Sequence, residues 1–350
     1  MTGPHHAIAL TRLAVRRALG QIEEATEGGL VLVACSGGAD SLALAASVAF
    51  EAPRAGLSAG AVVVDHDLQE GSRATAERAA DQCRGLGLDP VEVVTVHVVP
   101  AGSPTSAGAG SGPEARARDA RYSAFEDVVE RVGAVAVLLG HTRDDQAEQV
   151  LLGLARGSGT RSLSGMPSRR GLYVRPLLGV ARATTVAACE AAGLTAWTDP
   201  HNTDPAYGRV RARGLLPLLE AELGPGAVAA LARSADLLRQ DADALDDLAA
   251  QARRQLGQTG KLGQLGDGVP PGQIEAEALR GFPKALRTRV WRLLALEAGC
   301  SPGALVSTHL EALDTLVTCW RGQGPIDLPG RVQASRSDGR VLIAATGQVE

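Results

Sequence analysis

Aromatic side chains are scarce in this chain of 350 residues, since Phe, Trp and Tyr together make up only 3% of it. A protein that stacks the bases of nucleic acid on aromatic platforms would have little material here. Charge of one sign is also lacking, because 35 Lys and Arg residues stand against 39 Asp and Glu residues, for a net charge of −4. This balance argues against a surface that coats a polyanion and leaves room for a local basic site.

Lysine is almost absent, since it occurs only at Lys261 and Lys284. The first 260 residues therefore offer no lysine for a Walker A loop, a kinase site or a Schiff base. The segment Thr259–Lys261 ends like a Walker A motif, but Gln255 stands where that motif requires its first glycine.

Paired cysteines and long apolar runs are missing as well. The cysteines are Cys35, Cys83, Cys189, Cys300 and Cys319. Without a Cys-x-x-Cys pair they are typical of a reduced protein, not of a disulfide scaffold, a zinc ribbon or an iron–sulfur protein. No apolar run approaches the ~18–20 residues of a membrane span, and the N-terminus has no signal-peptide pattern. We therefore expect a soluble, cytoplasmic protein.

The chain does contain a regular alternation in its first half. Four apolar or β-branched runs occur, at Leu30–Cys35, Ala61–Asp65, Val91–Val99 and Ala134–Gly140. Segments rich in Ala, Arg and Glu separate them, as helices would. Apolar strands that alternate with helices are typical of a parallel sheet covered on both faces. We predict an α/β fold with a parallel, Rossmann-like sheet.

The second half has a helical pattern. Leu231, Leu238 and Leu245 recur every seven residues, as on the buried stripe of a helix. Near the end of the chain, the pair Asp338–Gly339 is typical of the turn of a small β-hairpin.

The change of pattern predicts two domains. Residues 1–220 would form the α/β domain, and residues 221–350 a helical domain with a short C-terminal β-hairpin. Residues 101–113 are nearly all Gly, Ser, Ala and Pro, which predicts a mobile surface loop.

The end of the first predicted strand carries the most specific motif, "CSGGADS" (35–41). Ligands of parallel sheets bind at the carboxyl ends of the strands. Gly37 and Gly38 would let the backbone approach an anion, and the amides of the following helix favour phosphate. Asp40 would repel a bare phosphate, so its presence indicates a nucleotide accompanied by Mg²⁺. A tight strand–helix turn with a serine N-cap and an acidic first turn is the simpler alternative.

The second predicted strand ends in "VVVDH", which places Asp65 and His66 at the same edge of the sheet. An adenosine next to the phosphate loop would lie there. His66 is therefore a candidate for nucleotide contact, although a histidine at a strand end is often structural.

After the fourth strand comes an acidic helix. Thr142 can cap its N-terminus with Asp145 reaching back, and Gly157 is placed to end it. His141, Asp145 and Glu148 are spaced by four and three residues, so they share one face. The aspartates could merely complement the helix N-terminus, but that does not explain Glu148. One histidine and two carboxylates make a thin metal site, whereas a carboxylate pair that binds and deprotonates an amine fits better.

Three alternating arginines follow, at Arg209, Arg211 and Arg213. In an extended segment all three would point to one side. Such a ladder is usually a solvated face, but near a phosphate site it could hold pyrophosphate or an RNA backbone.

Several motifs together resemble one family. In chain order they are "CSGGADS", "VVDH", "PEARARDARY", "GHTRDDQAEQVLL", "RGSGTRSLSGM", "RPLL" and "DPHNTDPAYGRVRARGLLP". This order, over roughly residues 28–219, is similar to that of the tRNA(Ile)-lysidine synthase family, and the last acidic and basic motifs separate it from other pyrophosphate-loop proteins. Members use ATP to adenylate C2 of the wobble cytidine of an isoleucine tRNA, and L-lysine then displaces AMP.

The resemblance implies roles for individual residues. The ATP site would consist of Ser36, Gly37, Gly38, Ala39, Asp40 and Ser41, together with His66. Asp40 would also bind Mg²⁺, and with Asp145 and Glu148 it would form the catalytic set. Substrate binding would use Asp145, Glu148, Arg209, Arg211 and Arg213.

The resemblance also implies partners and shows departures. Residues 221–350 would be a tRNA-binding domain, the partners would be tRNA(Ile), L-lysine and ATP, and a homodimer would be compatible with the sequence. Val210 stands where many relatives have Asn, and Asp67 where Gly is usual. Two alternatives stay open: a tRNA thiolase on the same scaffold, and a non-catalytic adenine-nucleotide-binding module. The cysteine spacing disfavours the first, and the carboxylate pair with the arginines disfavours the second.

Overall fold

The computed structural model describes residues 3–23, 28–65, 71–96, 113–157, 159–199, 204, 206–258 and 273–346. Its contacts divide the chain into two compact units, Met1–Arg239 and Gln240–Glu350, which are described separately. The division falls inside helix α9 (Ala227–Gln258) and not at residue 220, where the sequence pattern changes. Residues 227–239 of α9 belong to the first unit, and within them Val228 shares a small core with Ala147 and Leu216.

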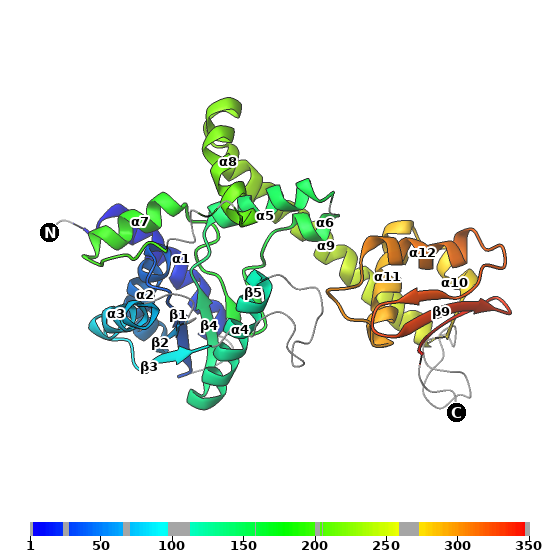
Figure 1. Cartoon of the computed structure of the whole chain (residues 1–350), viewed down its shortest axis with the longest axis horizontal. Coiled ribbons are helices and arrows are strands. Elements are labelled where there is room, and N and C mark those ends of the chain that lie inside the picture. The colour runs from blue at the N-terminus through cyan, green and yellow to red at the C-terminus, as the bar shows by residue number, and fades with distance from the viewer. Residues whose placement is uncertain are drawn as a thin grey trace. The chain divides into compact units, whose positions relative to one another are not determined.

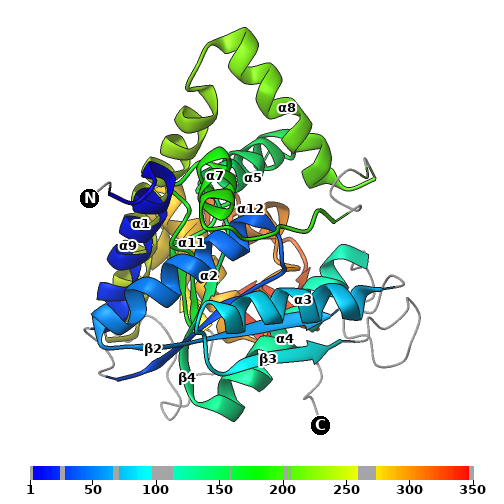
Figure 2. The same ribbon diagram turned by 90° about the vertical axis from the view of Figure 1, so that its left-hand side faces the viewer.

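A six-stranded sheet forms the centre of the first unit (Figures 1 and 2). Its strands are β1 (Leu30–Ala34), β2 (Ser58–Asp65), β3 (Val91–Thr95), β4 (Ala134–Leu139), β5 (Arg169–Arg170) and β6 (Tyr173–Val174). Their order is β3-β2-β1-β4-β6-β5, and every pairing is parallel except that of β5 with β6. The predicted α/β fold with a parallel sheet is confirmed.

Helices cover both faces of this sheet. They are α1 (His6–Glu23), α2 (Ala39–Glu51), α3 (Ser72–Gly85) and α7 (Arg182–Ala191) on one face, and α4 (Pro113–Val132) on the other. Figure 2 shows α2 and α3 on one side of the strands and α4 on the opposite side. Successive side chains of β1 alternate accordingly: Val31 and Val33 are buried under the first group, and Leu32 packs with Val128 of α4.

The strand order places the ligand edge between β1 and β4. The chain runs outward in one direction from β1 through β2 to β3 and then crosses back to β4 on the other side of β1. Sheets of this type bind ligands outside the carboxyl ends of the strands where the order reverses. The residues that follow β1 and β4 are therefore brought together at this point.

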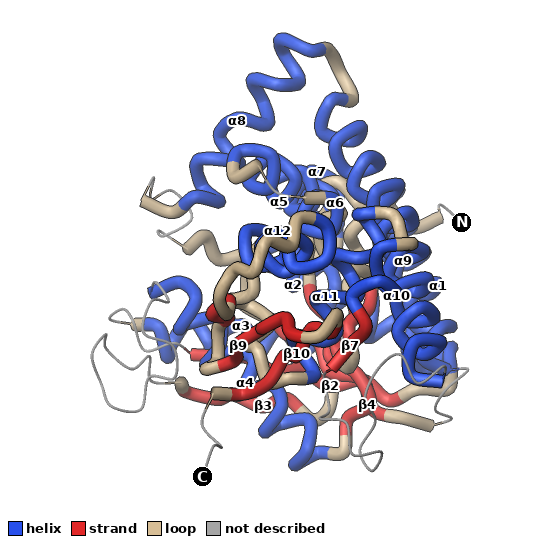
Figure 3. Tube along the Cα trace, turned by 90° about the vertical axis from the view of Figure 1, so that its right-hand side faces the viewer, coloured by secondary structure: helices blue, strands red, loops and turns tan. Residues whose placement is uncertain are grey.

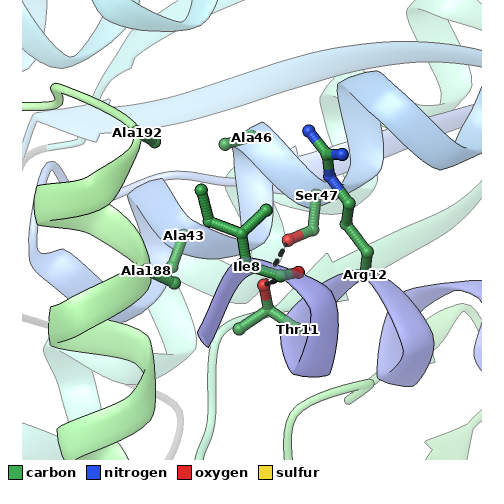
Figure 4. Close-up of a pocket in the computed structure, with 8 residues that line it drawn as sticks. All are labelled: Ile8, Thr11, Arg12, Ala43, Ala46, Ser47, Ala188 and Ala192. Carbon is green, nitrogen blue, oxygen red and sulfur yellow. Dashed lines mark hydrogen bonds between the residues drawn. The ribbon is translucent and has the colours of Figure 1, made fainter. Parts of the chain in front are cut away.

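Small side chains let α7 lie close to α1 and α2. Figure 4 shows the contact, around a cavity of about 30 Å³, and the residues that line it are Ile8, Thr11, Arg12, Ala43, Ala46, Ser47, Ala188 and Ala192. Across it, the Ser47 hydroxyl donates a 2.9 Å hydrogen bond to Oγ1 of Thr11. This close approach brings the start of α7 to the start of α2, where the phosphate loop lies.

The remaining elements of the first unit are short or helical: η1 (Ala52–Ala55), α5 (Arg143–Ala155), α6 (Thr160–Leu163) and α8 (Gly208–Leu223). Helix α8 packs on α5 through the small core that contains Leu216. None of the described helices is by itself long and apolar enough to cross a membrane, although α8 and α9 together pass that test by length and composition, with a bend of 108° between them.

The second unit has its own hydrophobic core. Figure 3 shows its helices and its sheet. Its elements after α9 are β7 (Gln273–Glu275), α10 (Ala276–Arg280), α11 (Lys284–Glu297), α12 (Ser307–Thr318), β8 (Ile326–Leu328), β9 (Val332–Ser337) and β10 (Arg340–Ala345). The sheet is antiparallel, in the order β7-β10-β9-β8. The hairpin at Asp338–Gly339 is present, with both residues at positive φ as a two-residue turn requires. Strands β7 and β8 were not predicted from the sequence, because each has only three residues.

Two sequence predictions fall outside the described residues. One is His66. The other is the loop of residues 101–113, where the structure describes only residue 113.

Candidate active site

The turn after β1 is folded around Ser41. The hydroxyl of Ser41 donates to the carbonyl oxygen of Gly38 at 2.9 Å and accepts from the backbone N–H of Ser36 at 3.2 Å. Gly37 has a φ of +78°, and a Cβ there would lie 3.2 Å from Cβ of Ala79. The turn therefore needs a glycine at position 37 for conformation and for space.

Helix α2 begins directly after this turn. Gly38 is its N-cap, so the serine N-cap that the simpler alternative required is not there, and no side chain caps the helix. The backbone N–H groups of Ala39, Asp40 and Ser41 form its first turn, and such groups have no partner within a helix. They are available to a phosphate at the carboxyl edge of the sheet.

Asp40 is held by helix α7. Its Oδ1 accepts from the hydroxyl of Thr185, and its Oδ2 accepts from Nε of Arg182 at 3.3 Å. Burial raises the pKa of Asp40, while Thr185 and Arg182 oppose that rise. Within the described residues no group of three or more His, Cys, Asp and Glu side chains could hold a metal ion by itself. A single carboxylate still fits Mg²⁺ when substrate phosphates complete its coordination.

The predicted acidic helix is α5, and its N-terminus has the predicted capping box. Oδ2 of Asp145 accepts from the backbone N–H of Thr142 at 2.7 Å and from its hydroxyl at 2.8 Å. The helix ends at Ala155, and Gly157 follows with a φ of +62°. Both predicted ends of the helix are confirmed.

Asp145 and Glu148 face two arginines. Arg182 contacts Oδ1 of Asp145 at 2.7 Å and Oε1 of Glu148 at 3.4 Å, and Nε of Arg213 contacts the same Glu148 oxygen at 2.7 Å. The Glu148 side chain is only 3% exposed. With Asp40, three carboxylates therefore share two guanidinium groups, and the cluster carries one negative charge in excess.

The surroundings shift the two carboxyl groups in opposite directions. Burial raises the pKa of Glu148, and its hydrogen bond to Arg213 only partly offsets this. Burial would also raise the pKa of Asp145, but Arg182 and the backbone N–H of Thr142 outweigh it, so the pKa of Asp145 is lowered. Of the pair, Glu148 is thus the stronger base, and Asp145 is the one held as an anion.

His141 lies beside this pair. Burial lowers the pKa of His141 to about 4, which nearby Arg175 and Arg209 reinforce and Asp145 opposes. The imidazole is neutral at pH 7, and its Nδ1 is buried without a hydrogen-bond partner in the described part of the chain.

The three arginines are not arranged as expected. Residues 209–213 lie in helix α8, so the extended segment is wrong and the three side chains do not share one side. In a helix, Arg209 and Arg213 lie one turn apart on the same face, whereas Arg211 lies on a different one. Arg213 contacts Glu148, Arg211 donates to the carbonyl oxygen of Ala206 at 3.0 Å, and Arg209 lies near His141.

Arg182 and Thr185 were missed by the sequence analysis. They lie in α7, a helix that was not assigned, and they contact Asp40 from far along the chain. One signal was available: an arginine at the first position of a helix is unfavourable next to the positive end of the dipole, unless acidic groups face it. The structure supplies these groups, since the backbone N–H of Arg182 donates to Oδ2 of Asp144 at 2.8 Å.

Two family models match the chain. Residues 11–219 match a PP-loop domain, and residues 275–342 match the TilS substrate binding domain.

Curated proteins are similar along most of the chain. The tRNA(Ile)-lysidine synthase of Thermobifida fusca (strain YX) is 54% identical over 346 residues, which cover 99% of this chain and all of that protein. That of Streptomyces coelicolor is 51% identical and covers 97% and 99% of the two chains. That of Mycobacterium bovis is 45% identical and covers 89% and 90%.

A solved structure is similar in fold. The U34-tRNA thiolase NcsA from Methanococcus maripaludis with its [4Fe-4S] cluster has a TM-score of 0.53 and 19% identity, and the match covers 67% of this chain and 80% of that one. At this identity the likeness concerns the fold alone.

The parallel sheet, the glycine turn after β1 and the first family match define an ATP-using enzyme of the PP-loop class. The second match and the curated relatives narrow this class. The chain belongs to the tRNA(Ile)-lysidine synthase family, which consists of ATP-dependent ligases of tRNA processing. The resemblance inferred from the motifs is confirmed, and the two alternative functions are not favoured.

Proposed function

We propose that this chain joins L-lysine to C2 of the wobble cytidine of an isoleucine tRNA with a CAU anticodon. In the first step the C2 oxygen of the cytidine attacks the α-phosphorus of ATP, and pyrophosphate leaves. In the second step the ε-amine of lysine bonds to C2, and AMP leaves with that oxygen. One proton is lost from the ammonium, and the product is lysidine. The observation that carries the proposal is the single network of Asp40, Arg182, Asp145 and Glu148 at the switch point of the sheet.

The phosphate loop supports the ATP half of this reaction. We assign ATP binding to Ser36, Gly37, Gly38, Ala39, Asp40 and Ser41, with His66 on the adenosine side. The amides at the start of α2 would receive the phosphates. Mg²⁺ bound by Asp40 would neutralise charge on the phosphates.

The carboxylate pair supports the lysine half. A lysine ammonium has a reference pKa of about 10.4 and cannot attack until it loses a proton. Asp145 is held as an anion and suits binding of the ammonium, whereas the raised pKa of Glu148 suits removal of the proton. Arg213 positions Glu148 through the contact of its Nε with Oε1.

The basic residues and the second unit support binding of tRNA. Arg209 and Arg211 lie at the start of α8, where they could meet the RNA backbone, while Arg213 is engaged by Glu148. We assign tRNA binding to the second unit, which contains the match to the substrate binding domain. The domain roles, the homodimer and the cytoplasmic location stay predictions.

The experiment that tests the proposed function is exchange of labelled pyrophosphate into ATP in the presence and absence of isoleucine tRNA. A PP-loop enzyme that adenylates tRNA shows exchange only when that tRNA is present. A nucleotide-binding module shows none under either condition, and that result would refute the adenylation step.

A further inference from the structure

We propose that Arg182 couples the two halves of the site: its guanidinium leaves Asp145 and Glu148 for the phosphates of bound ATP, so that nucleotide binding opens the lysine site. This inference rests on the proposed function and assigns Arg182 a positioning role. It sets the order of events, because lysine then binds well only after the nucleotide.

One guanidinium serves both halves of the site in the structure. Its Nε contacts Asp40 at the phosphate loop at 3.3 Å, while its Nη2 and Nη1 contact Asp145 at 2.7 Å and Glu148 at 3.4 Å. These carboxylates would otherwise attract the ammonium of lysine. In this arrangement Arg182 therefore occupies the charge position that the substrate needs.

The backbone allows the side chain to move alone. The N–H of Arg182 is fixed to Oδ2 of Asp144 at 2.8 Å, and Thr185 one turn later is fixed to Asp40. Helix α7 also packs on α1 and α2 (Figure 4). The start of α7 thus stays in place, and side-chain torsions suffice to turn the guanidinium.

Charge determines the direction of the coupling. A triphosphate at the start of α2 adds several negative charges beside Asp40, and a guanidinium binds phosphate oxygens in a two-pronged manner. Once Arg182 turns to them, Asp145 and Glu148 lose their ion pairs with Arg182 and keep those with Arg213. Two carboxylates with one guanidinium attract an ammonium, so nucleotide binding strengthens lysine binding. Linkage then requires lysine to strengthen nucleotide binding by the same factor.

The test is calorimetric titration of L-lysine into the full chain with unmodified isoleucine tRNA, with and without an ATP analogue whose α–β bridge is methylene. In the wild type the analogue should tighten lysine binding by at least about five-fold, the lower end of typical coupling. In Arg182→Met, lysine should bind without the analogue about as tightly as it binds the wild type with it, and the coupling factor should fall to about 1.

Arg16→Met is the matched control, since it removes a two-pronged ion pair with Glu51 that does not involve the site. It should keep the coupling of the wild type. If Arg182→Met fails to fold, Arg182→Lys replaces it: a single ammonium cannot span three carboxylates, so the coupling factor should fall below that of the wild type.

Unchanged coupling in the Arg182 variant that folds, or no coupling in the wild type, would overturn the proposal. A nucleoside assay on the same preparations separates this from failure of the proposed function. If the wild type forms lysidine but shows no coupling, only the role of Arg182 is contradicted. If no lysidine forms, the proposed function is contradicted as well.

Discussion

Arg182 and Asp145 are 37 residues apart in the chain, and their side chains meet at 2.7 Å between Nη2 and Oδ1. The same guanidinium contacts Asp40 of the phosphate loop. The residues assigned to ATP and those assigned to lysine are therefore parts of one ionic network, and changes on one side should be measurable on the other.

Replacing Glu148 by Gln should impair the lysine step selectively. The amide cannot take the proton from the ammonium, and general-base assistance is typically worth ~10²–10⁴-fold. Adenylation should survive at least in part, so adenylated tRNA should accumulate in a single-turnover experiment with labelled ATP. Glu190→Gln, on the exposed side of α7, is the control and should behave like the wild type. If both Glu148→Gln and Asp145→Asn keep a normal rate and a normal KM for lysine, the pair has no role in the lysine step and only complements the N-terminus of the helix.

The two glycines of the phosphate loop should respond differently to alanine. Gly37→Ala forces a side chain into a left-handed conformation and against Ala79, so it should lower the free energy of unfolding by ~1–2 kcal/mol. Gly38 has an ordinary φ of −75°, and a Cβ there meets only normal contacts. Gly38→Ala should therefore keep its stability in urea, while Gly38→Val should raise the KM for ATP by filling the phosphate position. Equal loss of stability in the two alanine variants would contradict the turn geometry.

The buried His141 should make stability depend on pH. The folded pKa is about 4, below the reference value of about 6.5 for an unfolded chain. As the pH falls below 6.5, the unfolded state binds a proton that the folded state refuses. The contribution of His141 to the free energy of unfolding is thus complete above pH 6.5. It is lost as the pH falls from 6.5 to 4, at no more than about 1.4 kcal/mol per pH unit.

Urea unfolding at several pH values checks this expectation. His141→Gln should reduce the slope between pH 6.5 and 4, and His6→Gln, at the exposed start of α1, is the control. An identical slope in the wild type and the His141 variant would show that the imidazole titrates normally.

The arginines of α8 should divide into two functions. Replacing Arg209 and Arg211 by Gln should weaken tRNA binding and flatten its dependence on salt, by ~0.7–0.9 in the logarithmic slope for each phosphate that is no longer neutralised. Arg213→Gln should instead raise the KM for lysine, because Arg213 holds Glu148. The measurements are tRNA affinity across a salt series and initial rates across a lysine series. Arg84→Gln on α3 is the control. If the double variant has the same salt slope of tRNA binding as the wild type, Arg209 and Arg211 do not bind phosphate and only face solvent.

Much of the fold and part of the site could be predicted because the signals are local. The apolar run of β1, the glycine turn at 37 and the capping box of Thr142 with Asp145 each lie within a few residues of sequence. Each is determined by backbone conformation or by a contact one helical turn away, which a sequence pattern records directly.

The rest depends on contacts between distant segments. Thr185 and Asp40 are 145 residues apart, and nothing near either residue indicates the other. The alternating arginines at 209, 211 and 213 do not by themselves determine whether the backbone there is extended or helical. The packing of α8 on α5 stabilises the helical conformation of this segment. That contact joins distant parts of the chain, so the local sequence does not indicate it.

The most direct test of lysine transfer is mass spectrometry of nucleosides from isoleucine tRNA incubated with the full chain, ATP and isotopically labelled L-lysine. We expect one new nucleoside at the wobble position that carries the label, with AMP and pyrophosphate formed in equal amounts. An unchanged cytidine, or a modified wobble nucleoside without the label, would contradict the proposed reaction.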